Sequence, residues 1–309
     1  MRQQMPRLLF WLALPGALLV GIVAGWLLAG RLPLGLLLER AGVVTPATFV
    51  IPDEAQGQLE LYVLAGQSNM SGRGELAAVP VTHPHIFLFG NDYHWRLAAE
   101  PLDDSRDQVD LVSMESPNDE AGYSPGMAFA LALLAADPER QIGLIPCAKG
   151  GTSLADWTPS LAGNTLYGAC LQRIAAASTQ GRLAGVLFFQ GENDALRADA
   201  FPDDQVRISD GYGALFTEWL AQLRRDLDRP ELPIVFAQIG TNDRPEFFVN
   251  WELIQREQAS VELPCTAMIT TADLARRDAV HFTSASYDEI GARFARAYLE
   301  LIDTTDCTG

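Results

Sequence analysis

Four short polar segments of the 309-residue chain carry side chains that could act together on a substrate. The first contains Ser68, which closely follows the apolar run 61–65 and Gly66. A serine at the end of a buried strand can present its hydroxyl above a sheet, where a nucleophile is needed. Serine is also a frequent N-cap residue of helices, and residue type alone favours that structural role. The other segments therefore decide how Ser68 is interpreted.

The other three segments offer groups that would assist a nucleophilic serine. Asp278 precedes His281 by three residues, a spacing at which the carboxylate can orient the imidazole ring and stabilise its charged form. Gly150 and Gly151 can bring backbone N–H groups close to a developing oxyanion, because no side chain hinders the approach. The segment 190–194 adds side-chain amide donors. These residue types together predict a site for nucleophilic catalysis.

The elements between these segments indicate how they would meet. Short runs that are apolar almost throughout alternate with amphipathic helical patterns, which predicts a mostly parallel sheet covered on both faces. The chemistry of such sheets lies at the carboxyl ends of the strands, so we expect the four segments to converge on one edge. The expected strands are 61–65, 86–89, 141–146, 185–190, 232–239 and 266–270, and the expected helices are 126–136, 166–179, 212–228, 251–260 and 286–302.

The four segments, in this order, resemble the SGNH hydrolase superfamily, and more narrowly its sialate O-acetylesterase and carbohydrate esterase family 6 branch. The motifs are Gly-Gln-Ser-Asn-Met at 66–70, Cys-Ala-Lys-Gly-Gly-Thr-Ser at 147–153, Gln-Gly-Glu-Asn-Asp at 190–194 and Asp-Ala-Val-His-Phe at 278–282. The resemblance spans residues 58–302. It implies a three-layer α/β/α sandwich with a mostly parallel, flavodoxin-like sheet. It also implies a serine esterase that removes O-acetyl groups from a carbohydrate through an acetyl-enzyme, without a metal or organic cofactor.

The resemblance also assigns roles to residues. Ser68 would be the nucleophile, and His281 the general base that later protonates the leaving alcohol. The backbone amides of Ser68 and Gly151 would form the oxyanion hole together with the side chain of Gln190. Asn193 occupies the position of the superfamily's oxyanion asparagine, so Gln190 and Asn193 are alternatives for the third donor.

The acid that orients His281 has two candidates. Asp278 matches the general Asp-x-x-His pattern of the superfamily. Members of this branch can instead use the glutamate of Gln-Gly-Glu, which is Glu192 here. We expect Asp278 to be the main orienting acid, with Glu192 as the alternative.

A second serine motif, Gly-Tyr-Ser-Pro-Gly at 122–126, fits the Gly-x-Ser-x-Gly string of α/β-hydrolases. In that motif the residue after the serine donates its backbone N–H to the oxyanion. Pro125 has no N–H to donate, so Ser124 cannot serve in this way. The sequence instead predicts that Ser124 caps a helix whose first residue is Pro125.

The N-terminal part predicts export. Residues 8–30 contain no charge and would form a helix about 34 Å long, enough to cross a hydrocarbon core of about 30 Å. We expect a signal anchor over 1–31 that holds the catalytic domain on the exported side, because Arg2 and Arg7 favour a cytoplasmic N-terminus. Cleavage as a signal peptide, which would release a secreted protein, is the alternative. The remaining expected parts are a linker over 32–57, the esterase domain over 58–303 and a tail over 304–309.

Charge and cysteines narrow the function further. The chain has 39 acidic and 22 basic residues, and its formal net charge of −17 argues against nucleic-acid binding. The four cysteines could be bridged outside the cytoplasm, where pairing Cys265 with Cys307 would fasten the C-terminal tail, or they could be buried free thiols.

The expected partner is an acetylated carbohydrate. The rival functions are an SGNH lipase or thioesterase, and a catalytically idle carbohydrate-binding protein.

Overall fold

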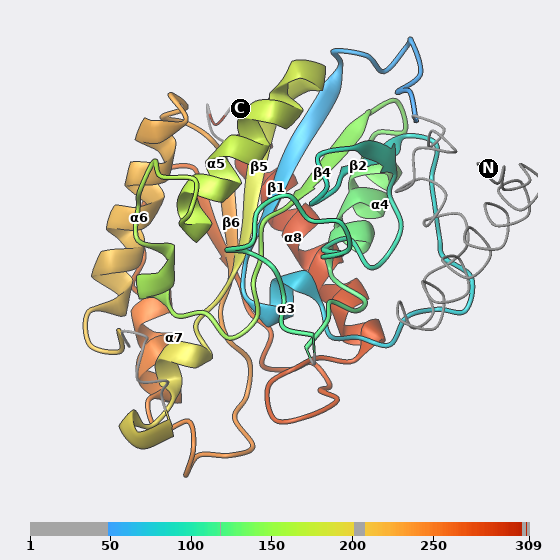
Figure 1. The fold of residues 1–309 in the computed structure, drawn as a ribbon. Coiled ribbons are helices and arrows are strands. Elements are labelled where there is room, and N and C mark those ends of the chain that lie inside the picture. Colours follow the sequence, from blue (N-terminus) through green and yellow to red (C-terminus); the bar gives the residue numbers. More distant parts are fainter. Residues whose placement is uncertain (1–48, 118, 201–207, 305–306, 308–309) are drawn as a thin grey trace, which may run out of the picture. The chain divides into compact units, whose positions relative to one another are not determined.

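A seven-stranded sheet with helices on both faces forms the body of the protein (Figure 1). The computed structural model describes residues 49–117, 119–200, 208–304 and 307. The compact unit begins at Val50, and the buried side chains of Ile51 and Ala55 belong to its core. The folded body therefore starts eight residues before the expected start at Gln58, inside the stretch that we expected to be a linker.

The strand order of the sheet is β3-β2-β4-β1-β5-β6-β7, and all neighbouring strands are parallel except β2 and β3. The five strands β4-β1-β5-β6-β7 follow the flavodoxin-like order 2-1-3-4-5, and the β2–β3 hairpin extends the sheet beyond β4. The predicted α/β architecture is confirmed. The bounds are β1 Leu59–Gly66, β2 Ile86–Phe89, β3 Trp95–Leu97, β4 Ile142–Pro146, β5 Gly181–Phe189, β6 Ile234–Ala237 and β7 Thr266–Ile269.

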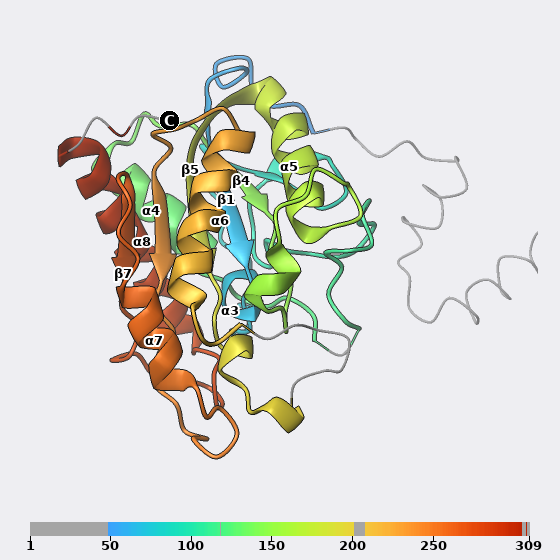
Figure 2. The same cartoon turned by 90° about the vertical axis from the view of Figure 1, so that its left-hand side faces the viewer.

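The helices cover the two faces of the sheet in separate groups (Figure 2). Helices α4 (Gly126–Ala136) and α8 (Ser284–Thr304) share one buried core with the sheet. Helices α5 (Leu166–Ala177), α6 (Tyr212–Asp226) and α7 (Trp251–Ala259) contribute to the other. Strand β1 is buried at seven of its eight positions, as expected for a strand covered on both faces.

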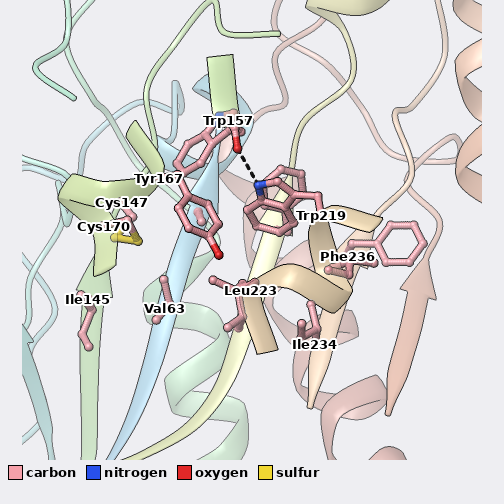
Figure 3. Close-up of a cluster of buried hydrophobic side chains, with 14 of the residues drawn as sticks. Val63, Ile145, Cys147, Trp157, Tyr167, Cys170, Trp219, Leu223, Ile234 and Phe236 are labelled. Carbon is pink, nitrogen blue, oxygen red and sulfur yellow. Dashed lines mark hydrogen bonds between the residues drawn. A yellow bond between two sulfur atoms is a disulfide. The ribbon is translucent and has the colours of Figure 1, made fainter. Parts of the chain in front are cut away.

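An aromatic cluster fills the core beneath α5 and α6 (Figure 3). The Trp219 indole donates a hydrogen bond of 2.8 Å to the backbone carbonyl of Trp157, and both rings pack against Phe188 of β5. Trp157 closes the short 3₁₀ turn η1 (Leu154–Trp157), which follows the Gly150-Gly151 segment. The packing of Trp157 in the core therefore fixes the C-terminal side of the Gly150-Gly151 segment.

The four cysteines form two disulfides, Cys147–Cys170 and Cys265–Cys307. The first joins the end of β4 to α5 and therefore fastens the N-terminal side of the Gly150-Gly151 segment. The second fastens buried Cys307 beyond the end of α8, so the tail is held at that position. Of the two interpretations of the cysteines, the disulfide-bonded one is the one observed.

The expected membrane span, residues 8–30, lies outside the described residues, as does most of the linker. Within the described part of the chain, no helix is long and apolar enough to cross a membrane.

Candidate active site

The site lies where the strand order of the sheet reverses. Strand β1 sits between β4 and β5, and the loops that leave these three strands contain Ser68, Gly151 and Gln190. Parallel strands bring their carboxyl ends to one edge, and the crevice at such a switch point is where α/β sheets bind ligands. The loops after β1, β4 and β5 therefore meet as the sequence predicted.

The turn from β1 into α3 (Ser68–Ser71) places the expected nucleophile. Gly66 has a φ of +132°, and a Cβ at this position would collide with the backbone carbonyl of Phe189 on β5. Only glycine can make this close approach. Ser68 is the first residue of the helix, and the first N–H groups of a helix have no acceptor within it.

Three side chains form a continuous relay. The Nε2 atom of His281 lies 2.9 Å from Ser68 Oγ, and its Nδ1 atom lies 2.9 Å from Asp278 Oδ2. Asp278 Oδ1 accepts hydrogen bonds from the backbone N–H groups of Val280 and His281, at 3.0 and 2.8 Å. Partial burial raises the pKa of Asp278. The hydrogen bonds from these N–H groups and the interaction with the His281 ring together outweigh this effect, so the pKa lies below its ordinary value. The acid is therefore a carboxylate at neutral pH.

Glu192, the alternative acid, has a different partner. Its Oε1 atom accepts a hydrogen bond from Asn69 Nδ2, and Tyr287 donates to Asn69 Oδ1 at 2.7 Å. The same Asn69 amide donates at 3.1 Å to the carbonyl of Val280, the residue before His281. Burial raises the pKa of Glu192 to about 7. Glu192 therefore binds Asn69, and Asn69 joins helix α3, which contains Ser68, to the segment that contains Val280 and His281.

The glycine segment after β4 is held by a residue that the sequence analysis did not identify. The backbone N–H of Gly150 lies 3.0 Å from each carboxylate oxygen of Glu115. Gly151 follows with a φ of +68°, a backbone conformation that favours glycine, and the residue is exposed. Glu115 belongs to the long connection between β3 and α4, where no periodic pattern marks a contact with position 150.

The side chain of Gln190 has several buried hydrogen-bond partners. Its side-chain N–H groups face Asp194 Oδ2 at 2.7 Å, the Thr152 carbonyl at 3.0 Å and Gln67 Oε1 at 3.2 Å, while Tyr212 donates to Gln190 Oε1 at 2.8 Å. An amide has two protons, and three buried acceptors already compete for them. The side-chain amide of Gln190 thus connects the segments of Gln67, Thr152 and Asp194. Asn193 begins the turn η3 (Asn193–Ala195) and is partly exposed.

The second serine motif is structural. Ser124 is buried, donates a hydrogen bond to Glu100 at 2.8 Å and accepts one from the backbone N–H of Gly126 at 3.2 Å. Helix α4 begins at Gly126 with Pro125 as its N-cap, one residue later than expected, so Ser124 lies just before the helix and binds the N–H of its first residue.

The described residues outside the relay add neither an exposed tryptophan platform at positions 157 and 251 nor a metal site. Trp157 and Trp251 are buried and therefore cannot stack on a sugar. Within the described ranges, no group of three or more His, Cys, Asp and Glu side chains could hold a metal ion.

A serine paired with an imidazole above a sheet of this order defines the class, an SGNH-type ester hydrolase. The family model described as "Carbohydrate esterase, sialic acid-specific acetylesterase" matches residues 58–300. The chain belongs to this family of carbohydrate acetylesterases and is an enzyme that hydrolyses ester bonds.

Individual relatives support this assignment. A probable carbohydrate esterase of Arabidopsis thaliana is 28% identical over 260 residues, which are 78% of this chain and 90% of the relative. Its solved structure matches with a TM-score of 0.62 at 26% identity and covers 79% of this chain and 98% of its own. NanS matches with a TM-score of 0.62 at 17% identity, over 81% of this chain and 99% of NanS. A carbohydrate acetylesterase from Xanthomonas citri matches with a TM-score of 0.57 at 18% identity, over 80% and 57%. At these identities the last two show a common fold.

Proposed function

We propose that the protein is a serine esterase that removes O-acetyl groups from a carbohydrate through an acetyl-enzyme intermediate. The observation that carries this proposal is the relay from Ser68 through His281 to Asp278, at 2.9 Å for each step, in a chain of the acetylesterase family. Relatives described as carbohydrate esterases support the choice of substrate class.

Acylation begins when Ser68 Oγ attacks the ester carbonyl and His281 Nε2 takes the hydroxyl proton. The carbonyl oxygen becomes an oxyanion, which the backbone N–H groups of Ser68 and Gly151 stabilise. When the tetrahedral intermediate collapses, the bond to the sugar oxygen breaks. That oxygen takes the proton from His281, and the acetyl group remains on Ser68.

Deacylation repeats these steps with water. His281 takes a proton from a water molecule as its oxygen attacks the acetyl carbonyl, and this proton passes to Ser68 Oγ when the tetrahedral intermediate collapses. Acetic acid leaves with the second proton of the water and ionises to acetate in solution. Asp278 keeps the proton of the neutral imidazole on Nδ1, so that Nε2 is the basic nitrogen in both steps. In the same proposal, Asn193 supplies the third oxyanion donor, because the amide of Gln190 is occupied elsewhere.

Acetate release from defined esters tests the proposal. The full chain is incubated with an O-acetylated sialic acid, with acetylated xylan, and with p-nitrophenyl esters of acetate and longer acids. We expect acetate from at least one acetylated carbohydrate, and none with Ser68→Ala. Preference for long acyl chains would favour the lipase or thioesterase function. Absence of turnover on every ester would favour the idle binding protein.

We also propose that the catalytic domain works outside the cytoplasm, anchored by residues 8–30. The two disulfides support export, because such bonds persist in oxidising compartments. Retention in the membrane fraction after a carbonate wash is the expected result. A soluble exported product that begins between Gly25 and Leu32 would favour cleavage and secretion instead.

A further inference from the structure

We propose that Glu115 is a positioning residue that sets the spacing between the two backbone donors of the oxyanion hole. The proposal rests on the esterase function proposed above. It concerns a carboxylate that neither belongs to the relay nor touches the ester.

Glu115 joins the nucleophile helix to the glycine segment. Its Oε1 atom accepts hydrogen bonds from Ser71 Oγ at 2.8 Å and from the backbone N–H of Gly150 at 3.0 Å. Its Oε2 atom lies 3.0 Å from the same N–H. Ser71 ends α3, the helix that Ser68 begins, and Gly150 precedes Gly151. One buried carboxylate therefore connects both segments that present oxyanion donors.

Arg73 makes this connection rigid. It donates to Glu115 Oε1 at 3.0 Å, to Ser71 Oγ at 2.7 Å and to the carbonyl of Gly72 at 2.8 Å. Two further N–H groups bind the oxygens of Asp119, at 2.7 and 2.9 Å. Both Arg73 and Glu115 are buried, and a buried ion pair is stable only when its hydrogen-bonding groups are satisfied in this way.

The packing around Gly150 shows that the arrangement leaves little freedom. A Cβ at position 150 would collide with the Arg73 guanidinium and approach Glu115 Oε2 to 3.0 Å. A larger residue at this position would therefore displace the ends of the Arg73, Asp119 and Glu115 side chains. The Gly150 N–H is committed to Glu115, and the proposed function assigns the oxyanion donor to the next residue, Gly151.

Displacement of an oxyanion donor should slow the reaction without weakening substrate binding, because the oxyanion exists only during the reaction. Charge on the carbonyl oxygen develops only in the transition state, so a displaced donor lowers kcat and leaves ground-state binding almost unchanged. Loss of one oxyanion donor typically costs about 10²–10³ in kcat. Misplacement of the Gly151 amide relative to the Ser68 amide should have a similar effect.

Two variants separate position from charge. Glu115→Asp keeps the charge but withdraws the carboxylate by one C–C bond, about 1.5 Å, so it can no longer reach Ser71 and Gly150 together. Glu115→Gln removes the charge but keeps an oxygen for Ser71, Arg73 and Gly150. Asp119→Asn is the matched control, because Asp119 also binds Arg73, whereas the Gly150 N–H binds Glu115.

The measurements are kcat and KM for p-nitrophenyl acetate, and Ki for phenylboronic acid, whose tetrahedral adduct with a serine places an oxygen in the oxyanion hole. We expect Glu115→Asp to lower kcat about 100-fold and to raise Ki by a similar factor with KM nearly constant. Glu115→Gln should lose less than about tenfold, and Asp119→Asn about threefold or less. The reverse order, with Gln far worse than Asp, would overturn the proposal, because charge alone would then matter.

Two other outcomes of these measurements also decide whether the proposal holds. If Glu115→Asp does not fold, as judged by thermal unfolding, Glu115→Gln decides: a Ki raised severalfold at constant KM supports the proposal, and an unchanged Ki overturns it. If wild-type protein turns over no ester, the proposed function fails. If wild type is active and folded Glu115→Asp matches it, only this inference fails.

Discussion

The carboxylate of Asp278 lies 2.9 Å from His281 Nδ1, whereas the carboxylate of Glu192 is bonded to Asn69. Both acids were candidates for the same role, and the structure separates them by their partners. Asp278 also accepts hydrogen bonds from the backbone N–H groups of Val280 and His281, which help to keep it ionised.

Neutral isosteres test this separation. Asp278→Asn should lower kcat by about two to four orders of magnitude. The Asn oxygen would stay with the backbone N–H groups of Val280 and His281, so its NH2 group would face Nδ1 and favour the wrong tautomer of the ring. Glu192→Gln should cost less, because Gln can still accept the hydrogen bond from Asn69. Steady-state kinetics on p-nitrophenyl acetate makes the comparison. A dead Glu192→Gln beside an active Asp278→Asn would assign the triad to Glu192 instead.

Glu192 should also make stability depend on pH. Burial raises its folded pKa to about 7, against an ordinary value near 4.5, so the folded state holds this proton more tightly than the unfolded state. Between these two values the unfolded chain releases the proton first, and the free energy of unfolding must fall as pH rises. The contribution is on the order of 3 kcal/mol at most.

Glu192→Gln removes this titration. Thermal unfolding of wild type and variant from pH 4 to pH 8 should show the variant gaining stability relative to wild type as pH rises, with the gain levelling off above pH 7. A difference that stays constant over this range would contradict the raised pKa. Glu218→Gln is a control for surface charge, since the Glu218 side chain is 72% exposed and pairs only with exposed Arg225 among the described residues.

The two disulfides should have different effects on catalysis. Each closes a loop, of sequence separation 23 for Cys147–Cys170 and 42 for Cys265–Cys307, and each should stabilise the fold by about 3–4 kcal/mol. Cys147 lies three residues before Gly150, so replacing the Cys147–Cys170 pair by serines should lower kcat as well as Tm.

The Cys265–Cys307 pair provides the control. Its replacement by serines should lower Tm with kcat unchanged at 25 °C, because it fastens β7 and the chain beyond α8. Equal losses of kcat in the two double variants, measured on folded protein, would show that the first disulfide has no special effect on the glycine segment.

Much of the fold could be predicted because its elements have strong patterns. Helix α4 begins and ends at the predicted residues, and β2 does as well. The sequence does not predict strand β3, since its three residues are too few to establish a period. The early start of the body was missed because Ile51 and Ala55 stand among turn-forming residues.

The relay could be predicted from the sequence, whereas the supporting contacts could not. Ser68, His281 and Asp278 stand in short motifs whose spacing has a chemical meaning. Glu115 lies in a loop and meets Gly150 from 35 positions away, which no local pattern encodes. For the same reason, the partners of Gln190 became visible only with the fold.

The central claim is that Ser68 becomes acetylated during turnover, and trapping this intermediate tests it most directly. The enzyme is mixed with p-nitrophenyl acetate, quenched in acid within the first turnover, digested and analysed by mass spectrometry. We expect one acetyl group on the peptide that contains Ser68, and none in Ser68→Ala. The peptide that contains Ser124 should stay unmodified, and Ser124→Ala should turn over within severalfold of wild type. An acetyl group on Ser124 with Ser68 unmodified, or full activity of Ser68→Ala, would contradict the account.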